Sequence, residues 1–286
     1  LVRGGVRQTE ALESEKRLKQ AAKQFAIAAT HDPDYAPAHE GAARVYLALG
    51  MPSEAEMHFS RLAEIGEDVD VLLGLAKARE DRGAPEEAVI PLGKAVALRP
   101  DDIDIQRRYA RALSAAGRHD PALEALKRAM QKAAEPAGVA ADLAEACRAS
   151  DRDFDLVDAL VEARDKHPKD AALRTLLARA YFDAGKPDEA YREAKESTDI
   201  EPNAREAHSL LGRILRKQGK IDDAIKALRQ AAAAKGQHSE DWVELAWCYR
   251  DAGQRERALD AARRAQRLDE ASPLALRALG ELEEDS

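Results

Sequence analysis

Residues 239–272 read SEDWVELAWCYRDAGQRERALDAARRAQRLDEAS, and they carry two apolar series of helical spacing. The first series, spaced i, i+3, i+4 and i+7, consists of Trp242, Leu245, Ala246 and Tyr249. This spacing predicts one face of a helix. Gly253 follows, and glycine readily adopts the left-handed conformation in which a helix ends. The second series consists of Ala258, Leu259, Ala262 and Ala265. The stretch therefore predicts a helical hairpin: an A helix, a turn at Gly253 and a B helix.

The same pattern returns along the chain with a period of 34 residues. Small residues recur at Ala21, Ala55, Ala88, Ala122, Ala190, Ala224 and Ala258. Glycines recur five residues before such a slot, at Gly50, Gly83, Gly117, Gly185, Gly219 and Gly253. Prolines recur twelve residues after it, at Pro33, Pro100, Pro168 and Pro202. A period of this length is typical of a solenoid, in which each repeat buries its apolar face only against its neighbours.

The repeated residues resemble the signature of the tetratricopeptide-repeat family. The run from Trp242 to Tyr249 matches the first half of that signature, with Ala246 in a position often held by glycine. Ala21 and Phe25 match the second half. A relaxed version of the whole is formed by His208, Leu211, Gly212, Leu215, Ala224 and Leu228. The resemblance implies an all-α fold, a right-handed superhelical solenoid of antiparallel helix pairs.

The period divides nearly the whole chain into repeats. We expect an N-terminal leading or partial repeat at residues 1–35, with Gly4 and Gly5 in an unstructured end. Seven repeats then occupy 36–272, at 36–68, 69–102, 103–136, 137–170, 171–204, 205–238 and 239–272. A C-terminal capping helix is expected at 273–286.

Repeat 137–170 departs from the pattern. Asp151 replaces the turn glycine, and Leu156 replaces the small residue of the B helix. Overpacking at such a slot costs about 1–3 kcal/mol unless the facing residues are small. The facing A helix offers Ala140, Ala141 and Ala144. We interpret this repeat as a compensated one; a local hinge is the alternative.

Composition excludes several classes of function. The net charge of −8 argues against general affinity for nucleic acid. No apolar run approaches the roughly 18 residues that a membrane-spanning helix needs. We expect no direct membrane insertion and a cytoplasmic location, with a periplasmic location or a place in a larger anchored protein as alternatives.

The chain begins at Leu1 rather than at methionine, so its native N-terminus is expected to be missing. Richness in alanine, arginine and aspartate is typical of bacterial proteins.

No catalytic, metal-binding or cofactor-binding constellation is apparent, so we expect no enzyme activity and no cofactor. Four of the seven histidines occupy equivalent repeat slots in pairs, His31 with His167 and His39 with His208. The phosphate-binding glycine loops are absent. Asp151, Asp153, Asp155 and Glu162 stand at four positions of a calcium loop, yet Leu156 occupies the position that requires glycine. Cys147 and Cys248 lie three repeats apart, so we do not expect them to meet, and Cys147 is expected to be a small core residue.

The A helices carry a predicted binding site, because in this family they line the concave groove of the superhelix. The ninth position of successive A helices is held by Arg44, Lys77, Arg111, Glu145, Arg179, Arg213 and Trp247. Five of these seven residues are basic, although Lys and Arg make up only 45 of 286 residues. Neighbouring groove positions add Arg107, Arg108, Arg148, Arg216, Lys217 and Arg250. A basic inner wall in an acidic chain favours another protein or an acidic peptide as partner. The alternative is that these arginines pair with acidic residues of the next repeat.

The leading functional hypothesis is a non-catalytic scaffold or adaptor in a bacterial assembly for polarity, motility, secretion or the envelope. The two-carboxylate clamp of chaperone cofactors needs asparagines on the A helices, whereas the only asparagine here is Asn203, in a loop between repeats. Two alternatives stay open: a regulatory or substrate-recruiting region of a larger enzyme, and a self-assembling structural protein.

Overall fold

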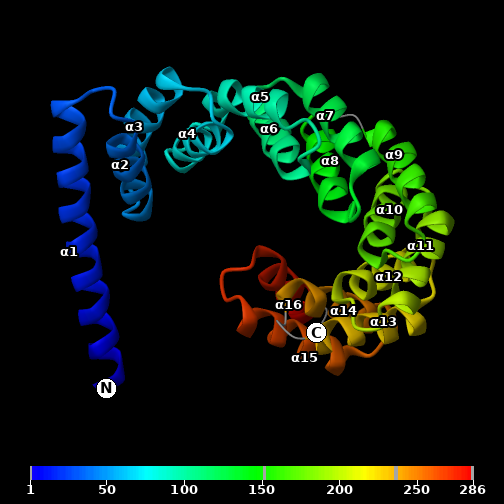
Figure 1. Ribbon diagram of the computed structural model, residues 1–286. Helices are drawn as coiled ribbons and strands as arrows, with labels where there is room; N and C mark the ends of the chain where they lie inside the picture. The colour runs from blue at the N-terminus through cyan, green and yellow to red at the C-terminus, as the bar shows by residue number, and fades with distance from the viewer. Residues whose placement is uncertain (1, 151–152, 235–237, 285–286) are drawn as a thin grey trace. The chain divides into compact units, whose positions relative to one another are not determined.

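The computed structural model describes residues 2–150, 153–234 and 238–284, without the side chains of 2–13 and 153–155. Throughout these residues the regular structure is helical (Figure 1). The chain divides into two compact units, Leu1–Ala134 and Glu135–Ser286, here called the N-terminal and C-terminal units.

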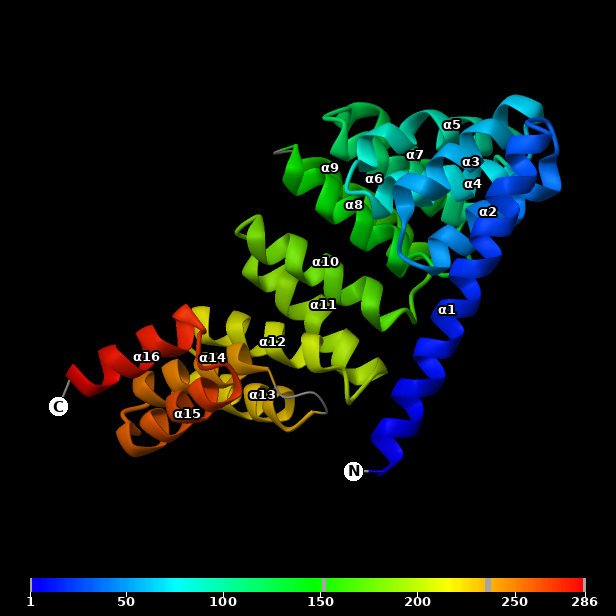
Figure 2. The same cartoon turned by 90° about the vertical axis from the view of Figure 1, so that its left-hand side faces the viewer.

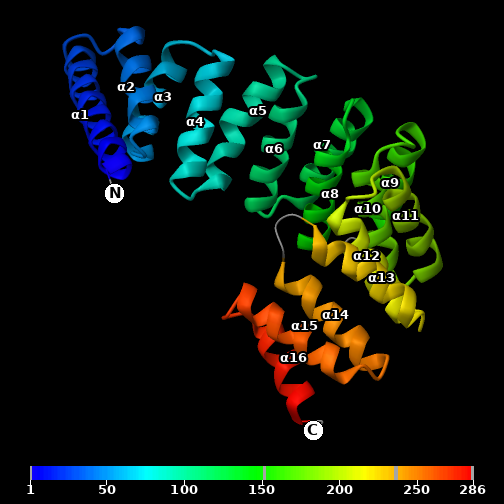
Figure 3. The ribbon, with the colours of Figure 1, turned by 90° about the horizontal axis from the view of Figure 1, so that it is seen from below.

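The N-terminal unit consists of one long helix followed by three hairpins. Its elements are α1 (Val2–His31), α2 (Ala36–Ala48), α3 (Pro52–Ile65), α4 (Val69–Asp81), η1 (Pro85–Ala88), α5 (Val89–Leu98), α6 (Ile103–Ala115) and α7 (His119–Lys132). Figure 3 shows them side by side in chain order. In the second hairpin the B helix begins with the short 3₁₀ turn η1, where Pro85 starts the element.

The C-terminal unit consists of four hairpins and a terminal helix. Its elements are α8 (Ala137–Ala149), α9 (Asp153–Lys166), α10 (Ala171–Asp183), α11 (Pro187–Ile200), α12 (Arg205–Lys217), α13 (Ile221–Ala233), α14 (Ser239–Asp251), α15 (Arg255–Leu268) and α16 (Pro273–Glu284). The A helices are α8, α10, α12 and α14, and the B helices are α9, α11, α13 and α15.

In every hairpin except that of α8 and α9, the turn contains a left-handed glycine, as in the hairpin of α14 and α15. Gly253 has a φ of 72°, a conformation that costs residues with a Cβ atom about 1 kcal/mol or more. The Gln254 N–H donates to the Tyr249 carbonyl at 2.8 Å, and the Gly253 N–H donates to the Arg250 carbonyl at 2.9 Å. These two bonds satisfy carbonyls at the end of α14 that would otherwise lack partners. The recurring glycines are therefore confirmed as turn residues.

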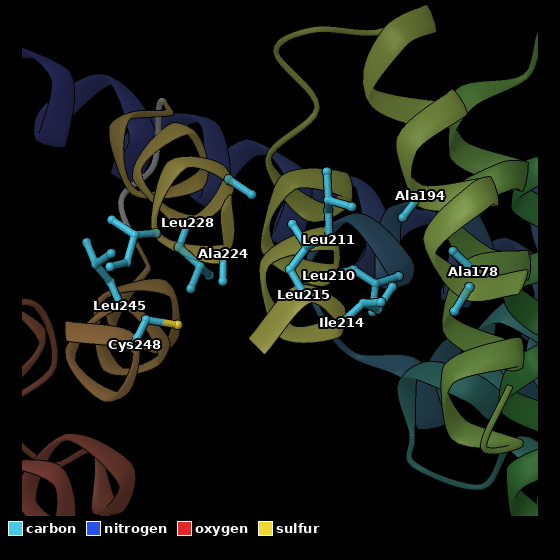
Figure 4. Packing of buried hydrophobic residues seen from close by; sticks show 13 residues of the cluster. Ala178, Ala194, Leu210, Leu211, Ile214, Leu215, Ala224, Leu228, Leu245 and Cys248 are labelled. Carbon is cyan, nitrogen blue, oxygen red and sulfur yellow. The ribbon is translucent and has the colours of Figure 1, made fainter. Parts of the chain in front are cut away.

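The core runs as a ribbon through successive hairpins rather than forming a closed centre. In the C-terminal unit one continuous cluster extends from Ala178 on α10, through Ile214 on α12, to Cys248 on α14 (Figure 4). The small slots allow the helices of one hairpin to approach closely, and Ala190, Ala224 and Ala258 are each fully buried. Each hairpin thus stabilises the next, as expected for a repeat protein.

The two layers of the C-terminal unit are packed differently. Each A helix contacts the next one along the chain, from α8 to α10, α12, α14 and then α16. Successive B helices of the described residues make no comparable contacts with one another. Figure 2 shows α10, α12 and α14 on one side and α11, α13 and α15 on the other. The A side is therefore the tighter, inner face of this unit, and the B side is its outer face, with grooves between neighbouring helices.

A side-chain hydrogen bond joins several A helices to the loop that precedes them. His39 Nε2, Arg174 Nε and His208 Nε2 donate to the carbonyls of the prolines six residues earlier, at 3.1, 2.9 and 2.9 Å. The amide of Gln106 makes the same bond to the carbonyl of Pro100. We call this recurring contact the proline latch. Its signal in the sequence is a polar donor six residues after each recurring proline.

Charged pairs also link elements of the C-terminal unit. Asp241 on α14 is 1% exposed and accepts a hydrogen bond of 2.9 Å from Arg205 on α12. Glu193 on α11 accepts hydrogen bonds from Arg164 on α9 and from Arg174 on α10. Because a buried carboxylate is costly without a cationic partner, these contacts favour one register between neighbouring hairpins.

Two details differ from the expectations drawn from the sequence. The leading segment is a single 30-residue helix that packs on α2, so Gly4 and Gly5 lie in α1 and not in an irregular end. No turn glycine or proline interrupts the stretch from Val6 to His31, which explains the continuous helix. In repeat 137–170, Leu156 and Ala140 are buried, whereas Ala141 is exposed and cannot compensate for Leu156. Asp151 lies outside the described residues.

Candidate functional site

The inner face of the C-terminal unit carries the downstream half of the predicted basic residues. Arg148 on α8, Arg179 on α10 and Arg213 on α12 are exposed, and Glu145 interrupts the basic series. These residues lie on consecutive A helices, which pack on one another.

Two predicted arginines of α12, Arg213 and Arg216, pair with acidic residues of the next A helix, α14. Arg216 on α12 donates to Asp251 on α14 at 2.7 Å and lies 3.5 Å from Glu244. Arg213 lies 3.5 Å from the other oxygen of Glu244, and its side chain remains 45% exposed. Burial opposes the charge on Arg216, but the hydrogen bond to Asp251 and the two carboxylates raise its pKa above the usual value. The pairing orients Arg213 while it leaves much of its guanidinium accessible.

Aromatic rings hold further cations on this face. The Arg250 guanidinium lies over the ring of Trp247 at 4.4 Å, and that of Arg213 lies over Phe182 at 5.5 Å. Lys217 also approaches Phe182, with its Nζ 4.9 Å from the ring centre. Such stacking contributes about 0.5–1 kcal/mol at exposed sites and leaves the edge of the guanidinium available for hydrogen bonds.

A shallow hollow of 240 Å³ lies between α14 and the terminal helix α16. It is lined by Arg216, Trp247, Arg250, Leu274, Arg277 and Glu281. Arg250 is 3.5 Å from Glu281, and Arg277 is 2.6 Å from the same carboxylate. Three arginines and one carboxylate therefore surround an apolar floor that Trp247 and Leu274 provide.

The predicted residues of the N-terminal unit pair mostly with nearby acidic residues. Arg44 is 2.6 Å from Glu40, and Lys77 is 3.0 Å from Asp81, each one turn away on its own helix. In the cluster on α6, Arg108 donates to Glu80 on α4 at 2.9 Å, and Arg107 lies 3.7 Å from Asp104. Arg111 is exposed on the same helix. The acidic groups expected to meet this cluster are thus partly supplied by the chain itself.

Sequence reasoning missed Phe182, Leu274 and Arg277 as members of the inner face. Phe182 follows Tyr181 in the A helix, and an aromatic residue at this twelfth position is a signal that the sequence does carry. The contributions of Leu274 and Arg277 depend on how α16 packs against α14, which repeat spacing does not encode.

A further cluster of titratable side chains lies in the N-terminal unit. His39 and His58 lie 3.0 Å apart through their Nδ1 atoms, and the ring of Tyr46 stacks on His58 at 5.7 Å. Burial, followed by the charge of His39, lowers the pKa of His58. No group of three or more metal-binding side chains occurs within the described residues. None of the described helices is long and apolar enough to cross a bilayer.

Comparisons with known families and structures agree with this architecture. Two models of the tetratricopeptide-repeat family match residues 157–214 and 209–275. A comparison with curated protein sequences found no match.

Several solved structures share the fold. A structure of pilF from Pseudomonas aeruginosa superposes with a TM-score of 0.56 at 19% identity, covering 76% of this chain and 97% of that chain. Yeast Tom70 superposes with a TM-score of 0.59 at 15% identity, covering 94% of this chain and 59% of that one. For the APC/C hetero-tetramer Cut9–Hcn1 the TM-score is 0.57 at 15% identity, with coverages of 93% and 52%. At these identities the likeness shows the fold alone.

Proposed function

Because the chain carries tetratricopeptide repeats, we propose that it is a non-catalytic scaffold that binds another protein through the inner face of its C-terminal unit. The preferred ligand is an acidic peptide segment of that protein. The observation that carries the proposal is the Trp247–Arg250 hollow, where a guanidinium stacked on an indole lies beside two further arginines.

The charges around this hollow favour carboxylates. Arg216, Arg250 and Arg277 share the hollow with a single carboxylate, that of Glu281. An incoming carboxylate can therefore form charge-assisted hydrogen bonds with guanidinium groups that are already oriented by Trp247 and by their own acidic neighbours. Preorganised side chains lose less conformational entropy on binding, which favours affinity.

The wider role that we propose is an adaptor within a multiprotein assembly. Repeat solenoids offer extended surfaces rather than a reaction chamber, and the inner face here continues from α10 to α16. The cellular assembly that we favour is a bacterial one, for polarity, motility, secretion or the envelope.

The test uses peptides selected by display against the intact chain, with binding followed by the fluorescence of Trp247 in a Trp242→Phe background. The chain has two tryptophans, so this variant isolates the inner-face signal. We expect the selected peptides to be rich in Asp and Glu. We also expect the double variant Arg213→Glu, Arg250→Glu to bind them at least about tenfold more weakly, a loss of about 1.4 kcal/mol or more.

The matched control is Lys226→Glu together with Lys195→Glu, which changes the charge by the same amount on the outer helices α13 and α11. This control should keep its affinity within about twofold, because both lysines are exposed and neither lines the Trp247–Arg250 hollow. Selected peptides without an acidic bias, or equal losses in both double variants, would contradict the proposed site.

A further inference from the structure

A second hollow lies on the outer side of the C-terminal unit, between the B helices α13 and α15. It has a volume of 540 Å³, and its floor is formed by Trp242, Leu245 and Tyr249 of α14. Arg229 of α13 and Arg257 and Arg264 of α15 also line it. We call it the outer arginine hollow. It is distinct from the Trp247–Arg250 hollow, which is lined by residues of α12, α14 and α16.

The three arginines of this hollow have no carboxylate partner in the part of the chain that the structure describes. The Arg264 guanidinium lies over the ring of Trp242 at 4.5 Å, and Arg257 donates to the side-chain oxygen of Gln254 at 2.7 Å. None of the three forms an ion pair with a carboxylate among the described residues, and no acidic side chain lines the hollow. This differs from the inner face, where Arg213, Arg216 and Arg250 all have acidic neighbours.

The repeat pattern does not account for this arginine set. One repeat earlier, the residues at the same three positions are Lys195, Asp223 and Gln230. Lys195 there pairs with Asp199 at 2.6 Å, and Asp223 pairs with Lys226 at 2.8 Å. The earlier groove thus has one cation and one anion where the outer arginine hollow has three cations.

Trp242 supplies a further unpaired group. In four other repeats the residue at this position forms the proline latch, a hydrogen bond to the carbonyl of the proline six residues earlier. Six residues before Trp242 the chain has a glycine, at position 236, and no proline. The indole Nε1 of Trp242 is buried and has no hydrogen-bond acceptor among the described residues. A buried donor without an acceptor costs about 1–3 kcal/mol, and such an unsatisfied donor often marks a site that a ligand completes.

We propose that the outer arginine hollow is a second docking site, which binds an acidic segment of a partner protein with an apolar residue between its carboxylates. The guanidinium groups of Arg229, Arg257 and Arg264 bind the carboxylates, and the apolar residue packs on Trp242 and Leu245. Three arginines around one hollow match a short acidic peptide. They offer no extended basic track for a nucleic-acid backbone, and the chain as a whole carries a charge of −8. The protein would then bind on both faces of the C-terminal unit.

The experiment uses Trp242 as the reporter, in the intact chain with Trp247→Phe as its background. The probe is the peptide acetyl-Gly-Glu-Asp-Leu-Asp-Glu-Gly-amide, compared with a version in which Gln and Asn replace the acidic residues. We expect a saturable change in Trp242 emission with the acidic peptide only. We also expect the affinity to fall by about tenfold or more in the triple variant Arg229→Gln, Arg257→Gln, Arg264→Gln.

The matched control is the triple variant Arg192→Gln, Lys195→Gln, Lys226→Gln, which removes three exposed cations from α11 and α13, none of which lines the outer arginine hollow. Its affinity should stay within about twofold of that of the background protein. This variant loses the same net charge as the arginine variant, but it keeps all three arginines of the hollow. Circular dichroism and thermal melting verify that both triple variants keep the fold.

Several results would overturn the proposal. One is a lack of saturable binding up to about 1 mM, the weakest affinity that a specific site of this kind should show. A second is an equal loss of affinity in the two triple variants. A third is tighter binding of a single-stranded oligonucleotide than of the peptide, and a fourth is equal saturation by inorganic phosphate. Self-association that the arginine variant abolishes, measured by sedimentation, would assign the hollow to a second copy of this chain instead.

Discussion

Leu228 on α13 packs directly against the backbone of Gly212 on α12. A Cβ atom built at Gly212 would lie 2.9 Å from Cδ2 of Leu228 and closer still to its Cγ. Leu228 is fully buried in the core cluster, so its side chain has little room to move away. The close approach of the two helices in this hairpin therefore depends on glycine at position 212.

We predict that Gly212→Ala destabilises the protein by about 1–3 kcal/mol through overpacking, despite the better helix propensity of alanine. The control is Gly280→Ala on the exposed side of α16, where no atom lies within 4 Å of the added Cβ. That substitution should stabilise by about 0.5–1 kcal/mol from helix propensity alone. Urea unfolding of the two variants measures both effects, and two changes of the same sign would contradict this account.

The proline latch predicts that the stability of the protein depends on a hydrogen-bond donor at position 208. His208→Leu removes the donor to the Pro202 carbonyl and should cost about 1 kcal/mol, the usual net contribution of one hydrogen bond. His208→Gln should restore most of that loss, because Gln106 makes the equivalent bond in its own repeat. Thermal melting of the two variants provides the comparison. If glutamine is no better than leucine, the bond contributes little to stability.

The His39–His58 pair predicts a dependence of stability on pH. The Nε2–H of His39 donates to the Pro33 carbonyl, so its Nδ1 accepts and the Nδ1 of His58 is the donor between the rings. Burial, together with the charge of His39, lowers the pKa of His58 in the folded state below 6.5. The unfolded state therefore binds a proton first as the pH falls below that value, and the free energy of unfolding decreases.

Chemical denaturation between about pH 7.5 and pH 5 should show this loss, which is complete once the pH passes the folded pKa. The variant His58→Gln lacks the group and should lose less stability over the same interval. Parallel pH profiles of the two proteins would rule out His58 as the source.

The two cysteines should be chemically inert in the folded protein. Cys147 and Cys248 are both fully buried, and burial raises the pKa of the Cys248 thiol to about 12. Since the thiolate is the reactive form, neither should react with iodoacetamide near neutral pH until the chain unfolds. Mass spectrometry along a urea titration would follow this, and labelling of Cys248 well before the unfolding transition would contradict its burial.

Much of the architecture was predictable from short-range patterns. The spacing of Trp242 and Tyr249, the left-handed glycine at Gly253 and the small slot at Ala258 each act within one hairpin, so one 34-residue segment carries them. The N-terminal helix was predicted less well. Its continuity through Gly4 and Gly5 reflects helix propagation without a stop signal, and the repeat pattern contains no information about it.

The sequence by itself determined the helical hairpins and their order, because these follow from helix periodicity and local turn chemistry. Only the tertiary structure decided which charges neutralise one another. Arg108 meets Glu80, and Arg216 meets Asp251, across the contact between successive hairpins. It also decided that Arg229, Arg257 and Arg264 surround one hollow without a carboxylate. The physical reason is that a long side chain finds its partner through the packing angle and register of neighbouring helices, which a linear period does not specify.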